Sequence, residues 1–304
     1  MHKTPFLIMV LGSIVSACGG SNVSSPTATT VPTPNPAPTM STPALIREID
    51  LETQTGTAYT LDWSPDGEIL AVASGYEITL LGNDLKVKIV VLRPEGGALG
   101  ISWNPDQTKF ATVNGYRNPT LKIWEWDRGK LRLNRISEID AGSDQYGVFW
   151  SPDGRLLASL ADDDKTTFQI WDASTGEELQ KYELPYANPL RTASWSADSA
   201  TLYGAGEARG QIVIFALSVA NGEVHELAKI PVSQAAAFAV SRDEKTLAIS
   251  DPRGVVQLLD VASGEVKTGV KSVDQPVDLA WNPDGSTLAI LDYKTKLQLW
   301  DVSE

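Results

Sequence analysis

Hydrolytic or zinc chemistry would depend on very few residues of this sequence. Nucleophilic catalysis places a histidine beside a serine or cysteine, and zinc sites draw mainly on histidine and cysteine. The sequence has two histidines, His2 and His225, and a single cysteine, Cys18. His225 stands in "NGEVHELAKI", which we expect to be an outer β-strand, where an exposed histidine needs no chemical role. We therefore expect no catalytic residue and no enzyme.

Two other short patterns could hold a ligand. The acidic run Asp162–Asp164 falls at a predicted turn between strands, where aspartate is common, and it lacks the ligand spacing of a calcium loop. "GAGEARG", which begins at Gly204, follows a predicted strand, but no helix follows it, as a phosphate-binding loop would require. We expect neither a metal nor a cofactor.

The composition narrows the class of partner. The chain of 304 residues has 25 Lys and Arg against 38 Asp and Glu, with no basic run. Phosphate binding needs concentrated positive charge, so the sequence predicts no nucleic-acid role. The hydrophobic content of 42% is enough for a large core.

The first residues look like an export signal. "PFLIMVLGSIVSA" is a short apolar stretch that is typical of the core of a signal peptide. It runs into "VSAC", which resembles the lipobox of bacterial lipoproteins. The resemblance implies that residues 1–17 are removed and that Cys18 is acylated, with palmitate among the chains added. A plain secretory signal with a chance cysteine is the alternative.

The same resemblance predicts a location. Gly19, rather than aspartate, follows the cysteine, and by the lipoprotein sorting rule this favours the outer membrane in a bacterium with two membranes. In a bacterium with one membrane it implies the outer face of the plasma membrane. Residues 18–44 then form a tether, because 16 of the 23 residues from Ser21 to Pro43 are Ser, Thr or Pro.

The rest of the chain is built from six similar segments. They read "WSPDGEILAVA" at Trp63, "WNPDQTKFATV" at Trp103, "WSPDGRLLASL" at Trp150, "WSADSATLYGA" at Trp195, "VSRDEKTLAIS" at Val240 and "WNPDGSTLAIL" at Trp281. Each has a strand end, a tight turn and an alternating strand. Proline fixes φ in such a turn, aspartate accepts backbone N–H bonds, and glycine permits a positive φ. We therefore assign a structural role to the turn aspartates: Asp66, Asp106, Asp153, Asp198, Asp243 and Asp284.

A second signature follows most of these turns. "FQIWDASTGE" and "LQLWDVSE" are its clearest copies, and "LKIWEWDRGK" and "VQLLDVASGE" are variants. With both signatures the chain resembles the WD40-repeat β-propellers. The resemblance covers residues 45–304 and implies an all-β domain of six four-stranded blades.

One feature of that family is missing. Its Gly-His dipeptide occurs nowhere in the chain, so the hydrogen-bond network centred on that histidine cannot form. The propellers built from "PDG" repeats, such as the Tol-system periplasmic protein, are therefore a close alternative, although the "IWD" and "STGE" endings favour the WD type. Eight of the nine tryptophans fall at repeat positions. The ninth, Trp126, is either a core residue or an exposed contact.

The blade geometry of the family predicts a binding surface. The four strands of a blade are lettered a to d in chain order, with strand d outermost. The segments that lead from strand d of one blade to strand a of the next, and from strand b to strand c, open on one face, which we call the top face. Tyrosine and arginine there are the residue types that contribute most to interface energies. Those that we place on the top face are Tyr59, Tyr116, Arg117, Tyr146, Tyr186, Arg191, Arg209, Arg253 and Tyr293.

The sequence thus predicts a monomeric, lipid-anchored propeller outside the plasma membrane that binds a protein partner. Three alternatives stay open. The top face could bind a small molecule or carbohydrate, the channel mouth could hold a hydrolase with carboxylate or tyrosine chemistry, or the domain could serve in envelope assembly.

The segment "LIREIDLETQTG", Leu45 to Gly56, completes the ring. Five outer strands separate six repeats, and the sixth repeat stops at Glu304 before any outer strand of its own. Leu45, Ile46, Ile49 and Leu51 give the segment a strand pattern. We expect it to pair with strand c of the sixth blade and leave no open edge.

Overall fold

The computed structural model describes residues 42–53, 57–86, 88–92, 94, 97–114, 119–162, 165–187, 191–230, 237–272 and 275–303. The signal sequence, most of the tether with Cys18, and the site candidates Tyr116 and Arg117 lie outside these residues. So do Asp163 and Asp164 of the acidic run. None of the described residues forms a helix long and apolar enough to span a membrane.

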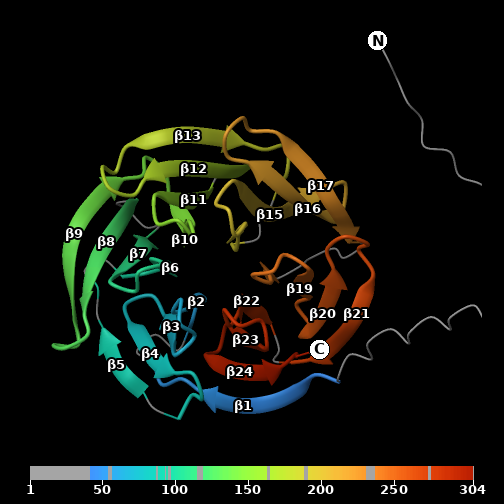
Figure 1. Cartoon of the computed structure of the whole chain (residues 1–304), viewed down its shortest axis with the longest axis horizontal. Helices are drawn as coiled ribbons and strands as arrows, with labels where there is room; N and C mark the ends of the chain where they lie inside the picture. Colours follow the sequence, from blue (N-terminus) through green and yellow to red (C-terminus); the bar gives the residue numbers. More distant parts are fainter. Residues whose placement is uncertain are drawn as a thin grey trace, which may run out of the picture. The chain divides into compact units, whose positions relative to one another are not determined.

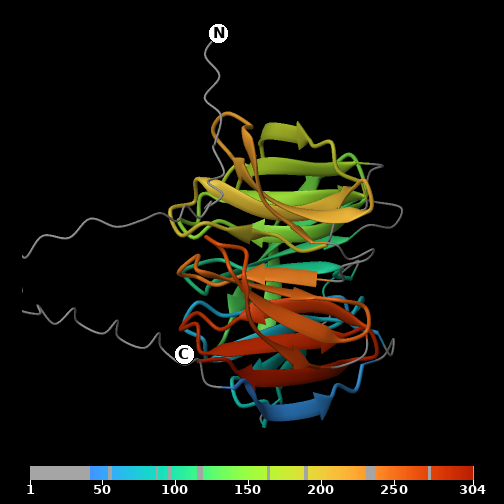
Figure 2. The ribbon, with the colours of Figure 1, turned by 90° about the vertical axis from the view of Figure 1, so that its right-hand side faces the viewer.

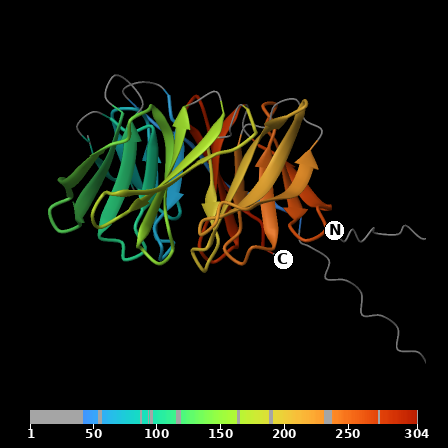
Figure 3. The same ribbon diagram turned by 90° about the horizontal axis from the view of Figure 1, so that it is seen from above.

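The unit from Pro38 to Glu304 forms a ring of six four-stranded antiparallel sheets, as the sequence predicts. Figure 1 looks down the ring axis, and Figures 2 and 3 show the ring from its edge. In each blade, strand a lines the centre and strand d lies outermost.

The first three blades follow the chain without interruption. Blade 1 contains β2 (Thr60–Trp63), β3 (Ile69–Ala73), β4 (Ile78–Gly82) and β5 (Lys88–Leu92); blade 2 contains β6 (Gly100–Trp103), β7 (Lys109–Asn114), β8 (Thr120–Asp127) and β9 (Arg132–Asp140); blade 3 contains β10 (Gln145–Trp150), β11 (Leu156–Asp162), β12 (Thr166–Asp172) and β13 (Glu178–Glu183).

The last three blades repeat this order, except that the outer strand of blade 6 comes from the start of the domain. Blade 4 contains β14 (Ser194–Trp195), β15 (Thr201–Ala208), β16 (Gln211–Ser218) and β17 (Val224–Ile230); blade 5 contains β18 (Ala237–Val240), β19 (Thr246–Ser250), β20 (Val255–Asp260) and β21 (Val266–Lys271); blade 6 contains β22 (Pro276–Trp281), β23 (Thr287–Asp292), β24 (Lys296–Asp301) and β1 (Ala44–Asp50).

The strand β1 closes the ring. It runs antiparallel to β24, with Ala44 opposite Asp301 and Asp50 opposite Lys296. Lys296 donates to Glu48 across this pair at 2.9 Å. Leu51, 8% exposed, continues into the core between blades 6 and 1. The closure predicted from the missing outer strand is confirmed.

The a-to-b turns use their aspartates as the sequence predicts. In all six blades the carboxylate accepts the backbone N–H two residues ahead, as Asp153 accepts from Arg155 at 3.0 Å. The left-handed position that follows is glycine in three blades, with Gly154 at φ 75°. The other three blades place Gln107, Ser199 and Glu244 there with φ between 60° and 63°. The turn conformation is therefore kept even where glycine is absent.

The apolar core divides into six clusters, one at each interface between neighbouring blades. Both faces of the middle strands are covered, which is why a strand such as β3 reads "ILAVA" and is buried throughout. Trp126 belongs to the cluster between blades 1 and 2. It is 6% exposed, and its ring lies 6.3 Å from that of Phe110. Trp126 is thus the core residue of the two alternatives.

The two faces of the ring can be defined by their turns. The top face carries the d-to-a and b-to-c segments, and the bottom face carries the a-to-b and c-to-d turns. Val302 N donates to Ser286 in an a-to-b turn, so Asp301 and its partner Ala44 lie at the bottom face. Leu51 N donates to Thr295 in a b-to-c turn, so β1 ends at the top face. The described chain therefore enters the ring from the bottom.

Candidate functional site

An aromatic pair marks the top face where blade 6 meets blade 1. Tyr59, on the segment before β2, and Tyr293, on the turn after β23, meet edge to face with ring centroids 6.3 Å apart. Tyr293 is 45% exposed and Tyr59 is half-buried. Two residues from opposite ends of the domain thus form one surface at the closure of the ring.

A second pair joins blades 3 and 4. Arg191 lies over the ring of Tyr146, with its guanidinium carbon 4.1 Å from the ring centroid. Arg191 is exposed, and Tyr146 is half-buried. A cation over an aromatic face is attracted by the ring quadrupole, and an exposed guanidinium can also donate hydrogen bonds outward. The pair can receive a carboxylate or a carbonyl of a partner.

Two further arginines of the predicted surface lie on b-to-c turns. Arg253 is exposed and donates to Asp251 through Nε and Nη2 at 2.9 and 2.7 Å. Arg209 is exposed on the turn after β15, near Glu226.

Tyr186 does not contribute its ring to the surface. It is 5% exposed and stacks on Phe215 of blade 4, with ring centroids 4.9 Å apart. Only its hydroxyl reaches outward, to Glu226 at 3.4 Å. Because the ring fills the core between blades 3 and 4, Tyr186 is a packing residue, and we leave it out of the candidate surface.

Tyr76 was missed by the sequence reasoning and belongs to the same surface. It lies on the b-to-c turn of blade 1 and is 65% exposed, the most of the exposed large hydrophobic side chains. It follows Trp63 by 13 residues, the offset that separates Tyr116 from Trp103. That repeated offset could have identified it. We call the described set Tyr59, Tyr76, Tyr146, Arg191, Arg209, Arg253 and Tyr293 the top-face set.

The centre of the ring holds a channel of about 320 Å³ that is lined by the a strands of all six blades. The channel wall carries two acids, Asp62 on β2 and Asp278 on β22. Asp278 is buried and Asp62 is half-buried; loss of contact with water raises the pKa of each carboxyl to about 7, and the neighbouring charge of Asp278 contributes to the rise at Asp62. Backbone N–H donors act in the opposite direction but do not cancel the effect of burial.

These acids join neighbouring blades. Asp278 Oδ2 accepts from Thr60 Oγ1 at 2.7 Å and from Leu61 N at 2.9 Å. Asp62 Oδ2 accepts from Trp103 N at 2.7 Å. At other interfaces a hydroxyl takes the same place, as Ser102 Oγ accepts from Trp150 N and Ser194 Oγ accepts from Val240 N. Side chains of strand a thus fasten each of these blades to the next one.

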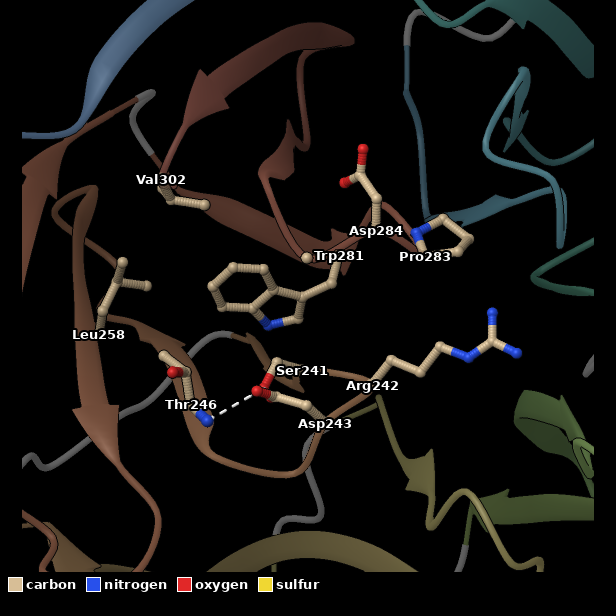
Figure 4. A pocket seen from close by; sticks show the side chains of 10 residues that line it. Ser241, Arg242, Asp243, Thr246, Leu258, Trp281, Pro283, Asp284 and Val302 are labelled. Carbon is tan, nitrogen blue, oxygen red and sulfur yellow. Dashed lines mark hydrogen bonds between the residues drawn. The ribbon is translucent and has the colours of Figure 1, made fainter. Parts of the chain in front are cut away.

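A cavity of about 400 Å³ opens on the bottom face between blades 5 and 6. Figure 4 shows the Trp281 ring directed toward Leu258 and Val302, while the side chain of Arg242 extends away from it. At the equivalent interface of blades 1 and 2, Ile69 stands in the place of Thr246, and Trp126 stands in the place of Val302. The cavity lies where blades 5 and 6 place smaller side chains at the same positions.

The described residues include no group of three or more His, Cys, Asp or Glu side chains that could hold a metal ion. His225 lies exposed on the outer strand β17, whereas the channel is lined by the a strands. The arrangement of the top-face set suits contact with another molecule.

Comparison with known proteins gives weak but consistent similarities. A family model described as eukaryotic translation initiation factor eIF2A matches residues 76–203, less than half of the chain. The WD repeat-containing protein 26 homolog of Drosophila melanogaster is 22% identical over 264 residues, which are 86% of this chain and 40% of that protein. The WD repeat and SOCS box-containing protein 1 of Mus musculus is 32% identical over 104 residues, 34% of this chain and 23% of that protein. The chain spans less than half the length of these relatives.

A solved structure supports the fold. A chain of Kuenenia stuttgartiensis hydrazine synthase superposes with a TM-score of 0.65 at 14% identity, covering 82% of this chain and 96% of that one. At this identity the likeness concerns the fold alone. The WD-repeat relatives, the six blades and the closing strand agree with one another: the chain folds as a six-bladed β-propeller and is similar to WD-repeat proteins.

Proposed function

We propose that the chain is a non-catalytic, lipid-anchored scaffold outside the plasma membrane that binds a protein partner through its top face. WD-repeat propellers generally bind protein partners, and the relatives named above carry such repeats. The observation that carries the proposal is the top-face set, in which exposed or half-buried tyrosines and exposed arginines from distant parts of the chain gather on one face. Tyrosine and arginine are the side chains that most often dominate interface energies.

The described chain enters at the bottom face, where Ala44 pairs with Asp301, so the top-face set lies on the opposite face of the ring. The anchor belongs to the outer membrane in a bacterium with two membranes, and otherwise to the outer face of the plasma membrane.

Photo-crosslinking in native membranes tests the face. A crosslinkable residue at Tyr76 should capture one defined partner, whereas the same residue at Asp284, in a bottom-face turn, should not. Capture should be lost in the Arg191→Ala, Tyr293→Ala double variant and kept in an Arg242→Ala variant, whose exposed arginine lies at the bottom mouth of the channel. Equal capture from both faces, or capture that survives the double variant, would sink the proposal.

The anchor is tested separately. We expect labelled palmitate to be incorporated into the wild-type chain and the protein to sediment with membranes, and the Cys18→Ser variant to lose both properties. Membrane association that persists without Cys18 would favour a plain signal or a different anchor.

A further inference from the structure

The cavity between blades 5 and 6 leaves one tryptophan ring partly uncovered. Trp281 is half-buried, whereas Trp63, Trp103 and Trp150 at the same repeat position are at most 8% exposed. Trp281 Nε1 donates to Ala239 O at 3.2 Å, and this bond fixes the ring. The fixed ring forms part of the wall of a cavity of about 400 Å³, a volume at the small end of the range for ligand pockets, roughly 300 to 1,000 Å³.

One side of the cavity is nonpolar. Leu258 and Val302 line it and are 1% and 5% exposed. Figure 4 shows the Trp281 ring directed toward both side chains. A bound molecule needs a nonpolar face on this side, because a polar group placed there would give up its hydrogen bonds to water without replacing them.

Two carboxylates also line the cavity, those of Asp243 and Asp284 on the a-to-b turns of blades 5 and 6. Figure 4 shows Asp284 on one side of the Trp281 ring and Asp243 on the other. The turns use Oδ1 of each carboxylate, which accepts from Lys245 N at 3.1 Å in blade 5 and from Ser286 N at 2.8 Å in blade 6. The second oxygen, Oδ2, can accept hydrogen bonds from a bound molecule.

The charged side chains around the cavity balance one another. Lys267 Nζ donates to Thr246 Oγ1 in the cavity wall at 3.1 Å and lies 3.7 Å from Asp260 Oδ2. Lys245 Nζ lies 3.6 Å from Asp243 Oδ2. A neutral molecule with hydroxyl donors fits this balance better than an ion, which would leave a net charge. The balanced set has three acids and three cations: Asp243, Asp260, Asp284, Arg242, Lys245 and Lys267.

We propose that this cavity is a binding site for a neutral sugar ring. One face of a pyranose carries mainly C–H groups and can pack on the Trp281 ring, while its hydroxyls donate to Asp243 and Asp284. The hydrogen bond from Ser241 lowers the pKa of Asp243, so this carboxylate is ionised at neutral pH. Hydrogen bonds to an ionised acceptor are stronger than those between neutral groups. The site lies on the bottom face and does not depend on the proposed partner of the top face.

The interface between blades 1 and 2 lacks the space that the sugar requires. The same turns place Asp66 and Asp106 there, but Ile69 and Trp126 fill the interface. The turn aspartates alone therefore do not make a site, whereas open space beside an uncovered indole ring does. This contrast supplies both a variant that closes the cavity and a matched control.

NMR of the full chain with labelled tryptophan tests binding of the methyl glycosides of glucose, galactose and mannose and of N-acetylglucosamine at millimolar concentrations. At least one sugar should shift the Trp281 indole signal, assigned with Trp281→Phe, until it saturates. Thr246→Ile combined with Val302→Trp fills the cavity and should abolish the shift. Saturation transfer from the protein to the C–H protons of the sugar should be lost in the same variant, and this measurement needs no assignment.

The carboxylate is tested by a matched pair of variants. Asp284→Asn should weaken sugar binding roughly tenfold, because asparagine keeps an acceptor oxygen but loses the charge that strengthens the bond. Asp106→Asn changes the same turn position at the filled interface and should leave the affinity unchanged.

Four outcomes would each overturn the sugar site. They are failure of every sugar to bind, binding that survives the filled cavity, equal loss of affinity in the two asparagine variants, and binding of benzyltrimethylammonium or benzyl alcohol in place of the sugars. The last outcome would identify a site for a cation or for a purely nonpolar ring.

Discussion

The left-handed position of the a-to-b turn is glycine in only half of the blades. Where it is not, two of the three side chains make a bond between blades. Ser199 Oγ accepts from Asp153 N at 3.0 Å. Glu244 accepts from Tyr203 OH at 2.6 Å and from Ala197 N at 2.9 Å. These bonds compensate for the less favourable backbone conformation of a residue with a Cβ atom.

Gln107 shows the cost of the backbone conformation by itself, because it makes no comparable bond between blades among the described residues. Gln107→Gly should raise the free energy of unfolding by about 1 kcal/mol, since glycine adopts a φ of 63° without strain. Ser199→Gly is the control and should gain less or lose stability, because it removes the bond to blade 3. Urea unfolding measures both, and a destabilised Gln107→Gly would contradict the explanation.

Single residues also show where sequence reasoning stops. The role of the turn aspartates followed from the chemistry of a turn that repeats six times, so neighbouring blades did not have to be known. The burial of Tyr186 depends on Phe215, a residue of the next blade. Its position on a d-to-a segment was compatible with either face of that segment, and only the packing decides.

Among the elements, β1 is the strand that closes the ring. Ile49 of β1 and the following Leu51 pack against the core shared by blades 6 and 1, while Leu45 and Ile46 stay 46% and 54% exposed. The pairing with β24 could be predicted because it required only a count of outer strands. The register irregularity between Leu45 and Arg47 could not, because it arises from local pairing geometry.

Leu51→Ala should lower the free energy of unfolding by about 2–3 kcal/mol, because it leaves a cavity at the joint that closes the ring. Ile46→Ala removes a side chain of similar size from an exposed position of the same strand and should cost little. Deletion of residues 45–51 should destabilise all six blades in one transition. A deletion variant that melts as the intact chain does would show that β1 is dispensable.

At the scale of the whole ring, the six interfaces between blades are built from the same strands, but they are not equally well packed. Ile69 and Trp126 fill the bottom of the interface between blades 1 and 2. Thr246 and Val302 leave a cavity of about 400 Å³ between blades 5 and 6. The repeat pattern predicted the number of interfaces. It could not predict this cavity, because its lining comes from side chains of two different blades.

The cavity makes a prediction about the whole ring, because an interface that holds a cavity is a place where a closed ring can open first. Thr246→Ile combined with Val302→Trp copies the side chains that fill the interface of blades 1 and 2, and it should raise the free energy of unfolding by about 1 kcal/mol. The gain is modest because Thr246 Oγ1 gives up a bond from Lys267 at 3.1 Å, and because the added ring must fit beside Trp281. Hydrogen exchange should show slower opening of β20 and β22 in this variant and little change in β3 and β8. If exchange slowed equally in every blade, the interface of blades 5 and 6 would not be where the ring first opens.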